Sequence, residues 1–173
     1  MHADPVWQPV LTSALLRLRP LTSADWPALL AAASDPLIWE LHPEPTRWQP
    51  EVFAKFFESA LTCRGAVVVE DAATGEVIGS SRFIGHDLQA RSVEIGYTFL
   101  VRSRWGGPFN RELKRLMLEH AFRLVDSVWF VVGETNWRSR RAMEKCGGVL
   151  VPTQEAPLSD RAPGRVFYRI LKP

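Results

Sequence analysis

The carboxylate with the clearest chemical use in this sequence is Glu94, which lies in the alternating run SVEIGYTFLV at residues 92–101. This alternation predicts a β-strand, whose side chains point to opposite faces in turn. One face is expected to carry the core residues Val93, Ile95, Tyr97 and Phe99. The other is expected to carry Glu94, Gly96, Thr98 and Leu100. Small neighbours leave room for a general base in apolar surroundings, although the strand alone favours an ordinary glutamate on a solvated face.

The strand leads into the segment WGGPFN at residues 105–110, which opens a helix predicted by the apolar periodicity of residues 109–125. Glycines before a helix leave backbone N–H groups free, and the positive end of the helix dipole favours an anion. Pro108 has no N–H to donate. The remaining donors are the amides of Gly106, Gly107, Phe109, Asn110 and Arg111. The segment therefore predicts either a phosphate cradle with one donor missing or only a turn into the helix.

A third candidate segment is TNWRS, in which Asn136 follows an apolar strand and Ser139 lies in the first turn of the next helix. The simpler interpretation is that Asn136 caps this helix and that Ser139 shares in the capping. The functional interpretation is that one of the two side chains faces a ligand between two β–α units. The basic cluster of the same helix either meets a phosphate or forms a solvated face; it consists of Arg138, Arg140, Arg141 and Lys145.

The elements that position these residues are read from periodicity and turn signals. Strands are expected at 15–20, 66–71, 77–85, 92–101, 127–133 and 165–173, and helices at 22–34, 51–61, 109–125 and 135–148. Antiparallel strands thus precede a β–α unit, which indicates an α/β architecture of the α+β type, with a mixed and mostly antiparallel sheet flanked by helices. Composition is uniform, so residues 1–173 are expected to form one domain.

The bulk composition is that of an ordinary globular chain, with 46% hydrophobic and 23% charged residues. A net charge of +2 gives no electrostatic argument for nucleic acid. The apolar runs are too short to span a membrane, and the first residues lack the pattern of a secretory signal. Two distant cysteines and four scattered histidines indicate neither a disulfide framework nor a metal site. A cytoplasmic location is expected.

Taken together, these segments resemble the GNAT acyltransferase superfamily, and within it the branch of the ribosomal-protein N-terminal acetyltransferases. The resemblance rests on LLRLRPLTSADWPAL, VEIGYTFLVRSRWGGPFN and ETNWRSRRAMEKCGG, and their order and spacing make it specific. It implies a sheet with a splayed strand pair and an acetyl-CoA or other acyl-CoA co-substrate without a metal. It also implies direct transfer of the acyl group to an amine of a small molecule or a protein N-terminus. The resemblance is also compatible with a side-by-side homodimer.

The resemblance assigns roles to particular residues. Glu94 matches the general base, and Ser139 would hydrogen-bond or protonate the departing thiolate. The pyrophosphate would lie on the amides from Gly106 to Arg111, and the pantetheine arm would pair with the strand near its end. The implied donor-binding residues are Phe99, Leu100, Val101, Arg102, Arg104, Trp105, Gly106, Gly107, Phe109, Asn110, Arg111, Asn136 and Ser139. The candidates for lining the acceptor pocket are Trp39, His42, Arg47 and Trp48. An equally good interpretation is that the tryptophans and prolines of this loop only anchor it to the protein.

The loop departs from the superfamily pattern, because Pro108 replaces the central glycine and Asn110 the final small residue. One lost hydrogen bond to a charged acceptor costs roughly 1.5–3 kcal/mol, which would weaken donor binding about tenfold to a hundredfold. Arg102 or Arg104 could compensate, or the missing N–H could point away from the phosphates. The alternative function is therefore a catalytically weakened GNAT-like module that binds acyl-CoA or a partner.

Overall fold

The structure is a computed structural model that describes residues 6–157 and 161–173. Its strands are β1 Leu11–Thr12, β2 Leu16–Pro20, β3 Ala66–Asp71, β4 Val77–Asp87, β5 Ser92–Leu100, β6 Ser127–Gly133, β7 Val149–Val151 and β8 Arg165–Leu171. Its α-helices are α1 Trp26–Ala33, α2 Pro50–Thr62, α3 Phe109–Ala121 and α4 Trp137–Lys145. All six predicted strands and all four predicted helices are present. The two-residue β1 and the three-residue β7 are too short to leave a periodic signal in the sequence.

The strands form one eight-stranded sheet in the order β1-β2-β3-β4-β5-β6-β8-β7. Every neighbouring pair is antiparallel except β5 and β6, which are parallel. This arrangement confirms the mixed, mostly antiparallel sheet expected from the sequence. Among the described residues, no helix is long and apolar enough to cross a membrane.

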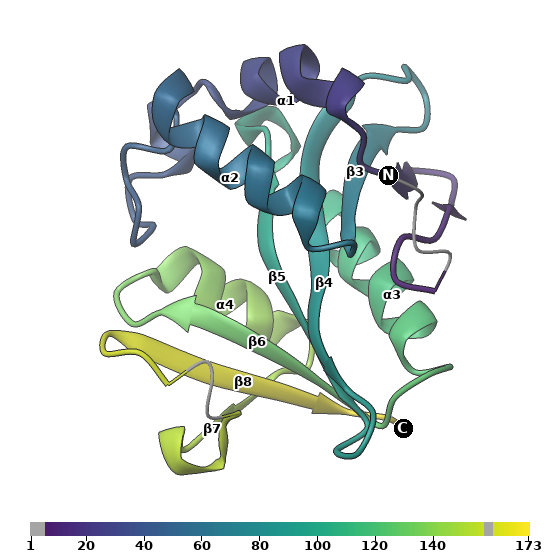
Figure 1. Cartoon of the computed structure of the whole chain (residues 1–173), viewed down its shortest axis with the longest axis vertical. Coiled ribbons are helices and arrows are strands. Elements are labelled where there is room, and N and C mark those ends of the chain that lie inside the picture. Colours follow the sequence, from purple (N-terminus) through teal and green to yellow (C-terminus); the bar gives the residue numbers. More distant parts are fainter. Residues whose placement is uncertain (1–5, 158–160) are drawn as a thin grey trace.

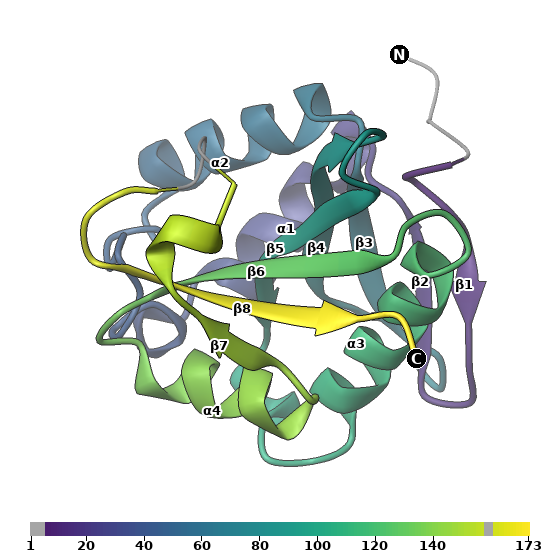
Figure 2. The same ribbon diagram turned by 90° about the horizontal axis from the view of Figure 1, so that it is seen from below.

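Helices cover the two faces of the sheet in pairs, with α1 and α2 on one face and α3 and α4 on the other (Figures 1 and 2). The larger core packs Leu113 and Met117 of α3 and Met143 of α4 against the sheet. The second core packs Leu29 of α1 and Phe53 of α2 on the opposite face. Burial on both faces explains why the central strands read as continuous apolar runs.

The parallel pair β5 and β6 stays together for only three residues on each strand. Ser92, Val93 and Glu94 pair with residues 127–129, and no pairing of the two strands is recorded beyond Trp129 among the described residues. The strands then diverge, as Figure 1 shows, and their carboxyl ends lead into α3 and α4. We call this opening the fork; it is the splayed strand pair that the resemblance implied.

A bulge in β5 overturns part of the predicted side-chain alternation. Opposite β4, residues 80 and 82 face Phe99 and Gly96, so β5 contains one extra residue here, and Tyr97 has a φ of 53°. Phe99 therefore packs in the α1/α2 core, whereas Leu100 packs in the α3/α4 core. The sequence placed Phe99 with Val93 and Ile95, and Leu100 with Glu94; both placements were wrong, because a bulge reverses the alternation beyond it.

Candidate active site

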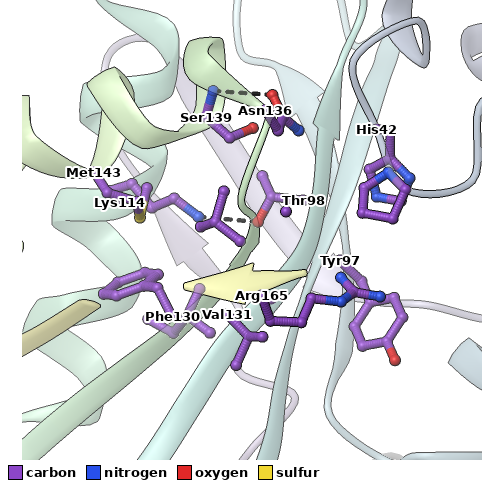
Figure 3. A pocket seen from close by; sticks show the side chains of 15 residues that line it. His42, Tyr97, Thr98, Lys114, Phe130, Val131, Asn136, Ser139, Met143 and Arg165 are labelled. Atoms are coloured by element: carbon purple, nitrogen blue, oxygen red, sulfur yellow. Dashed lines mark hydrogen bonds between the residues drawn. The ribbon is translucent and has the colours of Figure 1, made fainter. Parts of the chain in front are cut away.

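A cavity occupies the fork and is lined from both faces of the sheet. Lys114 and Ser139 line it from the side of α3 and α4, whereas His42, Tyr97 and Arg165 line it from the other side (Figure 3). The absence of backbone pairing between β5 and β6 creates this passage, since a continuous sheet would close it. Groups approaching from opposite faces can therefore meet within the fork.

Glu94 lies at the vertex of the fork, as the last β5 residue that pairs with β6. Its partner Trp129 belongs to a small core on the face opposite α3, so the carboxylate is on the α1/α2 face. A Cβ atom on Gly96 would lie 2.7 Å from Oε1 of Glu94, closer than such atoms pack. A larger residue at position 96 would therefore displace the end of the Glu94 side chain from its present position.

Asn136 and Ser139 both line the cavity, from the start of α4. The side chain of Asn136 caps this helix, because its Oδ1 accepts a hydrogen bond from the Ser139 N–H at 3.2 Å. The capping role predicted for Asn136 is confirmed, and it fixes the position of Ser139 in the fork. The nearby arginines have protein contacts of their own. Arg138 stacks 4.2 Å from the centre of the Trp105 ring, and Arg140 donates to the Glu134 carbonyl at 2.9 Å.

The loop before α3 presents free backbone donors where a phosphate cradle was expected. Pro108 is the N-cap residue of α3, and Gly106 has a φ of 70°, a left-handed conformation that favours glycine. The first backbone bond of the helix runs from the Glu112 N–H to the Pro108 carbonyl at 2.9 Å. Within the described part of the chain, the amides of residues 106, 107 and 109–111 have no hydrogen-bond acceptor.

The placement of Pro108 answers the question raised by the sequence. The first-turn donors of α3 are the amides of Phe109, Asn110 and Arg111, and these are the groups that a helix N-terminus offers to an anion. Pro108 precedes them and removes only the N–H of the N-cap residue. The exposed residues Gly106 and Gly107 add two further amides without an acceptor among the described residues. Five amide donors therefore remain free before and at the start of α3 in the described part of the chain.

Other residues expected at the donor site have partners within the protein. Arg102 forms an ion pair with Asp35, and Arg104 donates to Asp71 from two nitrogens at 3.0 and 2.8 Å. Trp105 donates from Nε1 to the Leu100 carbonyl at 2.9 Å. The three side chains therefore anchor the loop in this structure.

The backbone of the strand end is occupied as well. The Leu100 carbonyl accepts from Trp105, and the Val101 N–H donates to the Ile78 carbonyl at 2.8 Å. The pantetheine pairing expected near residues 99–101 therefore finds two of its backbone groups already bonded. The stretch of β5 that faces the fork lies earlier, at residues 95–98.

The sequence analysis missed Lys114, which is only 3% exposed. Its Nζ donates to Thr98 Oγ1 at 2.9 Å and lies 5.3 Å from the centre of the Phe130 ring (Figure 3). Burial lowers the pKa of this amine to about 8. A signal existed, because position 114 shares a helical stripe with Met117 and Ala121, where an apolar residue is expected.

The four acceptor candidates divide into two groups. Trp39 is 2% exposed and donates from Nε1 to the Ala33 carbonyl at 2.9 Å, so it anchors the loop as a core residue. Trp48 is exposed and lies outside the lining of the cavity. His42 lines the cavity. Arg47 contacts His42, with its Nη1 3.3 Å from His42 Nε2.

His42 is held neutral by its surroundings. Burial lowers its pKa to about 4, and the charges of Arg47 and Arg165 act in the same direction. Its Nδ1 accepts from the Glu44 N–H at 2.9 Å. In a neutral imidazole the other nitrogen then carries the proton. Nε2–H and the Arg47 guanidinium are therefore two donors that face each other.

Comparison with known proteins agrees with this geometry. The family described as the acetyltransferase (GNAT) domain matches residues 16–149. The chain belongs to the GNAT acetyltransferase family. No curated protein matches the sequence. The enzyme class is accordingly that of an acetyltransferase.

Solved structures resemble this GNAT acetyltransferase over nearly its whole length. A GCN5-related N-acetyltransferase from Brucella melitensis has a TM-score of 0.77 at 20% identity, over 95% of this chain and 79% of its own. An acetyltransferase from Agrobacterium tumefaciens str. C58 has a TM-score of 0.74 at 26% identity, over 95% of each chain. A spermidine N-acetyltransferase from Vibrio cholerae, in complex with CoA and spermine, has a TM-score of 0.68 at 21% identity, over 92% and 96%.

Proposed function

We propose that this GNAT acetyltransferase moves an acetyl or similar acyl group from CoA to a primary amine of a small molecule or a protein N-terminus. The observation that supports this most strongly is the fork, a cavity through the sheet between two β–α units. Free amides lie at the start of α3, beyond the carboxyl end of β5, and Glu94 lies at the vertex of the fork. Holding a thioester and an amine in such a passage supplies much of the rate of a direct transfer.

On the donor side, the amides of residues 106, 107 and 109–111 would bind the pyrophosphate of acyl-CoA. The backbone of residues 95–98, rather than that of residues 99–101, would pair with the amides of the pantetheine arm. Bound acyl-CoA would supply a thioester, which is the electrophile of the reaction. The free CoA complex of the Vibrio cholerae structure supports CoA as the donor scaffold.

On the chemical side, Glu94 would take a proton from the ammonium group of the acceptor, directly or through a water molecule. The nitrogen lone pair is then free to attack the thioester carbon. A backbone N–H of β5 in the fork would stabilise the oxyanion. The Ser139 hydroxyl, which α4 holds in the cavity, would donate a hydrogen bond to the sulfur as the C–S bond breaks.

The resemblance to the ribosomal-protein N-terminal acetyltransferases remains a proposal that rests on the quoted sequence segments. The cytoplasmic location and the single domain are also proposals, and they rest on the composition of the sequence. A homodimer is expected from the superfamily, and size-exclusion chromatography with light scattering measures it. The weakened-module alternative was motivated by Pro108. The position of that residue at the N-cap of α3 leaves the first-turn amides intact, so no observation favours this alternative.

The test is a calorimetric titration of acetyl-CoA into the purified protein, with free CoA titrated in parallel. Micromolar binding of both is the expected result, because the cradle and the fork bind parts that the two molecules share. Release of CoA in the presence of amines then measures transfer. Absence of binding at millimolar acetyl-CoA would contradict the proposed function.

A further inference from the structure

Arginine side chains gather on the α1/α2 side of the fork. Arg47 comes from the loop before α2, Arg82 from β4 and Arg165 from the start of β8. Burial lowers the pKa of Arg47 to about 10; the charge of Glu44 raises this pKa, whereas the charges of Arg82 and Arg165 lower it. None of the three belongs to an ion pair recorded among the described residues.

Aromatic rings hold two of these cations in place. Arg82 is 2% exposed, and its guanidinium carbon lies 4.4 Å from the ring centres of both Phe56 and Tyr97. Arg47 lies 4.7 Å from the centre of the same Phe56 ring and 5.3 Å from that of Trp39. Rings attract cations but carry no net charge. The positive charge of the cluster is therefore fixed in position and not neutralised by these contacts.

Arg82 has a structural role within this cluster. It donates to Ser59 Oγ at 2.9 Å and to the Phe56 carbonyl at 2.7 Å, which ties β4 to α2. Its Nε has no hydrogen-bond partner among the described residues. Arg47 and Arg165 are only half-buried, so they are the members that an incoming ligand can reach.

The contact between His42 and Arg47 lacks an acceptor. Because Nδ1 of His42 accepts from Glu44, its Nε2–H and the Arg47 Nη1 3.3 Å away both donate toward the same region. His42 and Arg165 line one cavity. A carboxylate has two oxygens that accept several hydrogen bonds, and a planar guanidinium matches it well.

We propose that the acceptor of this acetyltransferase is a primary amine that also carries a carboxylate, which His42, Arg47 and Arg165 bind. This inference rests on the proposed function. The carboxylate of the acceptor would lie among the arginines, while its ammonium group would lie toward Glu94 on the same face of the sheet. A polycation would meet like charges at this position, so a polyamine is a poor acceptor for this chain.

The test compares matched amines that differ by one carboxylate. Phenylalanine is paired with phenethylamine, and 4-aminobutanoate is paired with propylamine. Spermidine is the polycation. Each is titrated calorimetrically into the protein saturated with CoA, and each is then assayed with acetyl-CoA for CoA release. The expected result is at least about tenfold tighter binding of one carboxylated member over its neutral partner, and no detectable binding of spermidine.

Variants assign the effect to the cluster. Arg47→Met and Arg165→Met should each weaken the carboxylated amine at least about tenfold and leave the neutral amine within about threefold. Arg123→Met removes an exposed charge just beyond α3 and should change neither affinity. Thermal unfolding checks that each variant is folded, and the wild-type comparison needs no variant at all.

The outcomes are distinct. Equal binding within both pairs, or tighter binding of the neutral amines or of spermidine, would overturn the carboxylate proposal. The proposal would also be overturned if Arg47→Met and Arg165→Met both bound the carboxylated amines as tightly as the wild type does. Failure of acetyl-CoA to bind would contradict the proposed function instead, because amine binding is measured in titrations that do not depend on transfer.

Discussion

At the scale of single residues, the site combines a carboxylate, a neutral imidazole and a buried amine around one opening. Glu94 is at the vertex of the fork, and His42 and Lys114 line the cavity from opposite faces. The surroundings disfavour charge on the two nitrogen bases, because burial lowers the pKa of His42 to about 4 and that of Lys114 to about 8. The two sides of the cavity therefore present different nitrogen groups, an imidazole on one side and an amine on the other.

Glu94→Gln is expected to retain donor binding and to lose turnover. The amide keeps the shape of the side chain beside Gly96 but takes no proton, and general base catalysis contributes about 10²–10⁴-fold. Turnover at neutral pH should fall by that order, while the affinity for CoA from calorimetry stays within about threefold. Glu58→Gln, on the exposed side of α2, is the matched control and should retain full activity. Equal turnover of Glu94→Gln and the wild type would remove Glu94 from the mechanism.

Lys114→Met is expected to change how stability depends on pH. The lowered pKa means that the folded chain binds fewer protons than the unfolded chain between about pH 8 and 10.5. Wild-type stability should therefore rise with pH across this window, by up to about 3 kcal/mol. Below about pH 8 the amine is charged in the folded chain as well, so the full cost of burying its charge lowers the stability. Urea unfolding at several pH values measures this rise.

The variant has no amine to titrate, so its stability should be flatter than that of the wild type over the same window. Cys146 is the neighbour whose charge acts on Lys114, and its own pKa is raised by burial, so the thiol is kept in both proteins. Identical pH profiles for the two proteins would show that Lys114 is not the titrating group.

The candidate site could be anticipated from the sequence only in part. Glu94, Asn136 and the loop before α3 belong to segments that are contiguous in sequence, so their roles could be inferred locally. Lys114 shares a buried helical stripe with Met117 and Ala121, but the sequence analysis did not single it out. Arg82 and Arg165 are 83 residues apart in sequence, and only the folded sheet brings both of them near Arg47. Such a cluster has no local signal.

At the scale of elements, periodicity located the long helices and strands but not the bulge. Tyr97 adopts a positive φ without being glycine, so nothing in residue type marked the position. The consequence is that Tyr97 and Phe99 contact Phe56 of α2, whereas Thr98 contacts Lys114 of α3. A regular strand would place Tyr97 and Phe99 on the α3/α4 face and Thr98 on the α1/α2 face, and the bulge exchanges these two placements.

Pro108→Ala is expected to leave donor affinity nearly unchanged. Since Pro108 is the N-cap residue, the substitution restores an N–H outside the first-turn set of donors. The dissociation constant of CoA should change by less than about threefold. Gly106→Ala is the contrasting variant, because a side chain at a φ of 70° strains the loop, and it should weaken binding. Tenfold tighter binding by Pro108→Ala would show that the cradle lacks a donor after all.

At the scale of the whole molecule, the fork is a gap in the hydrogen-bonded sheet, so a donor that fills it should stabilise the fold. CoA at a hundred times its dissociation constant should raise the free energy of unfolding by about 2.7 kcal/mol. Amide hydrogen exchange should slow at residues 95–98. ADP carries the pyrophosphate without the pantetheine arm, so it should protect the start of α3 and leave residues 95–98 unprotected. Equal protection by ADP and CoA would contradict pairing in the fork.

The same gap bears on aggregation. Unpaired strand edges invite pairing with strands of other chains, and natural sheets limit this with very short edge strands. The outer edges of this sheet are the two-residue β1 and the three-residue β7, which offer little length for such pairing. The longer unpaired edges, those of β5 and β6, lie in the middle of the sheet between two layers of helices. The molecule thus keeps its longest unpaired strand edges inside, where the strands of other copies are less able to reach them.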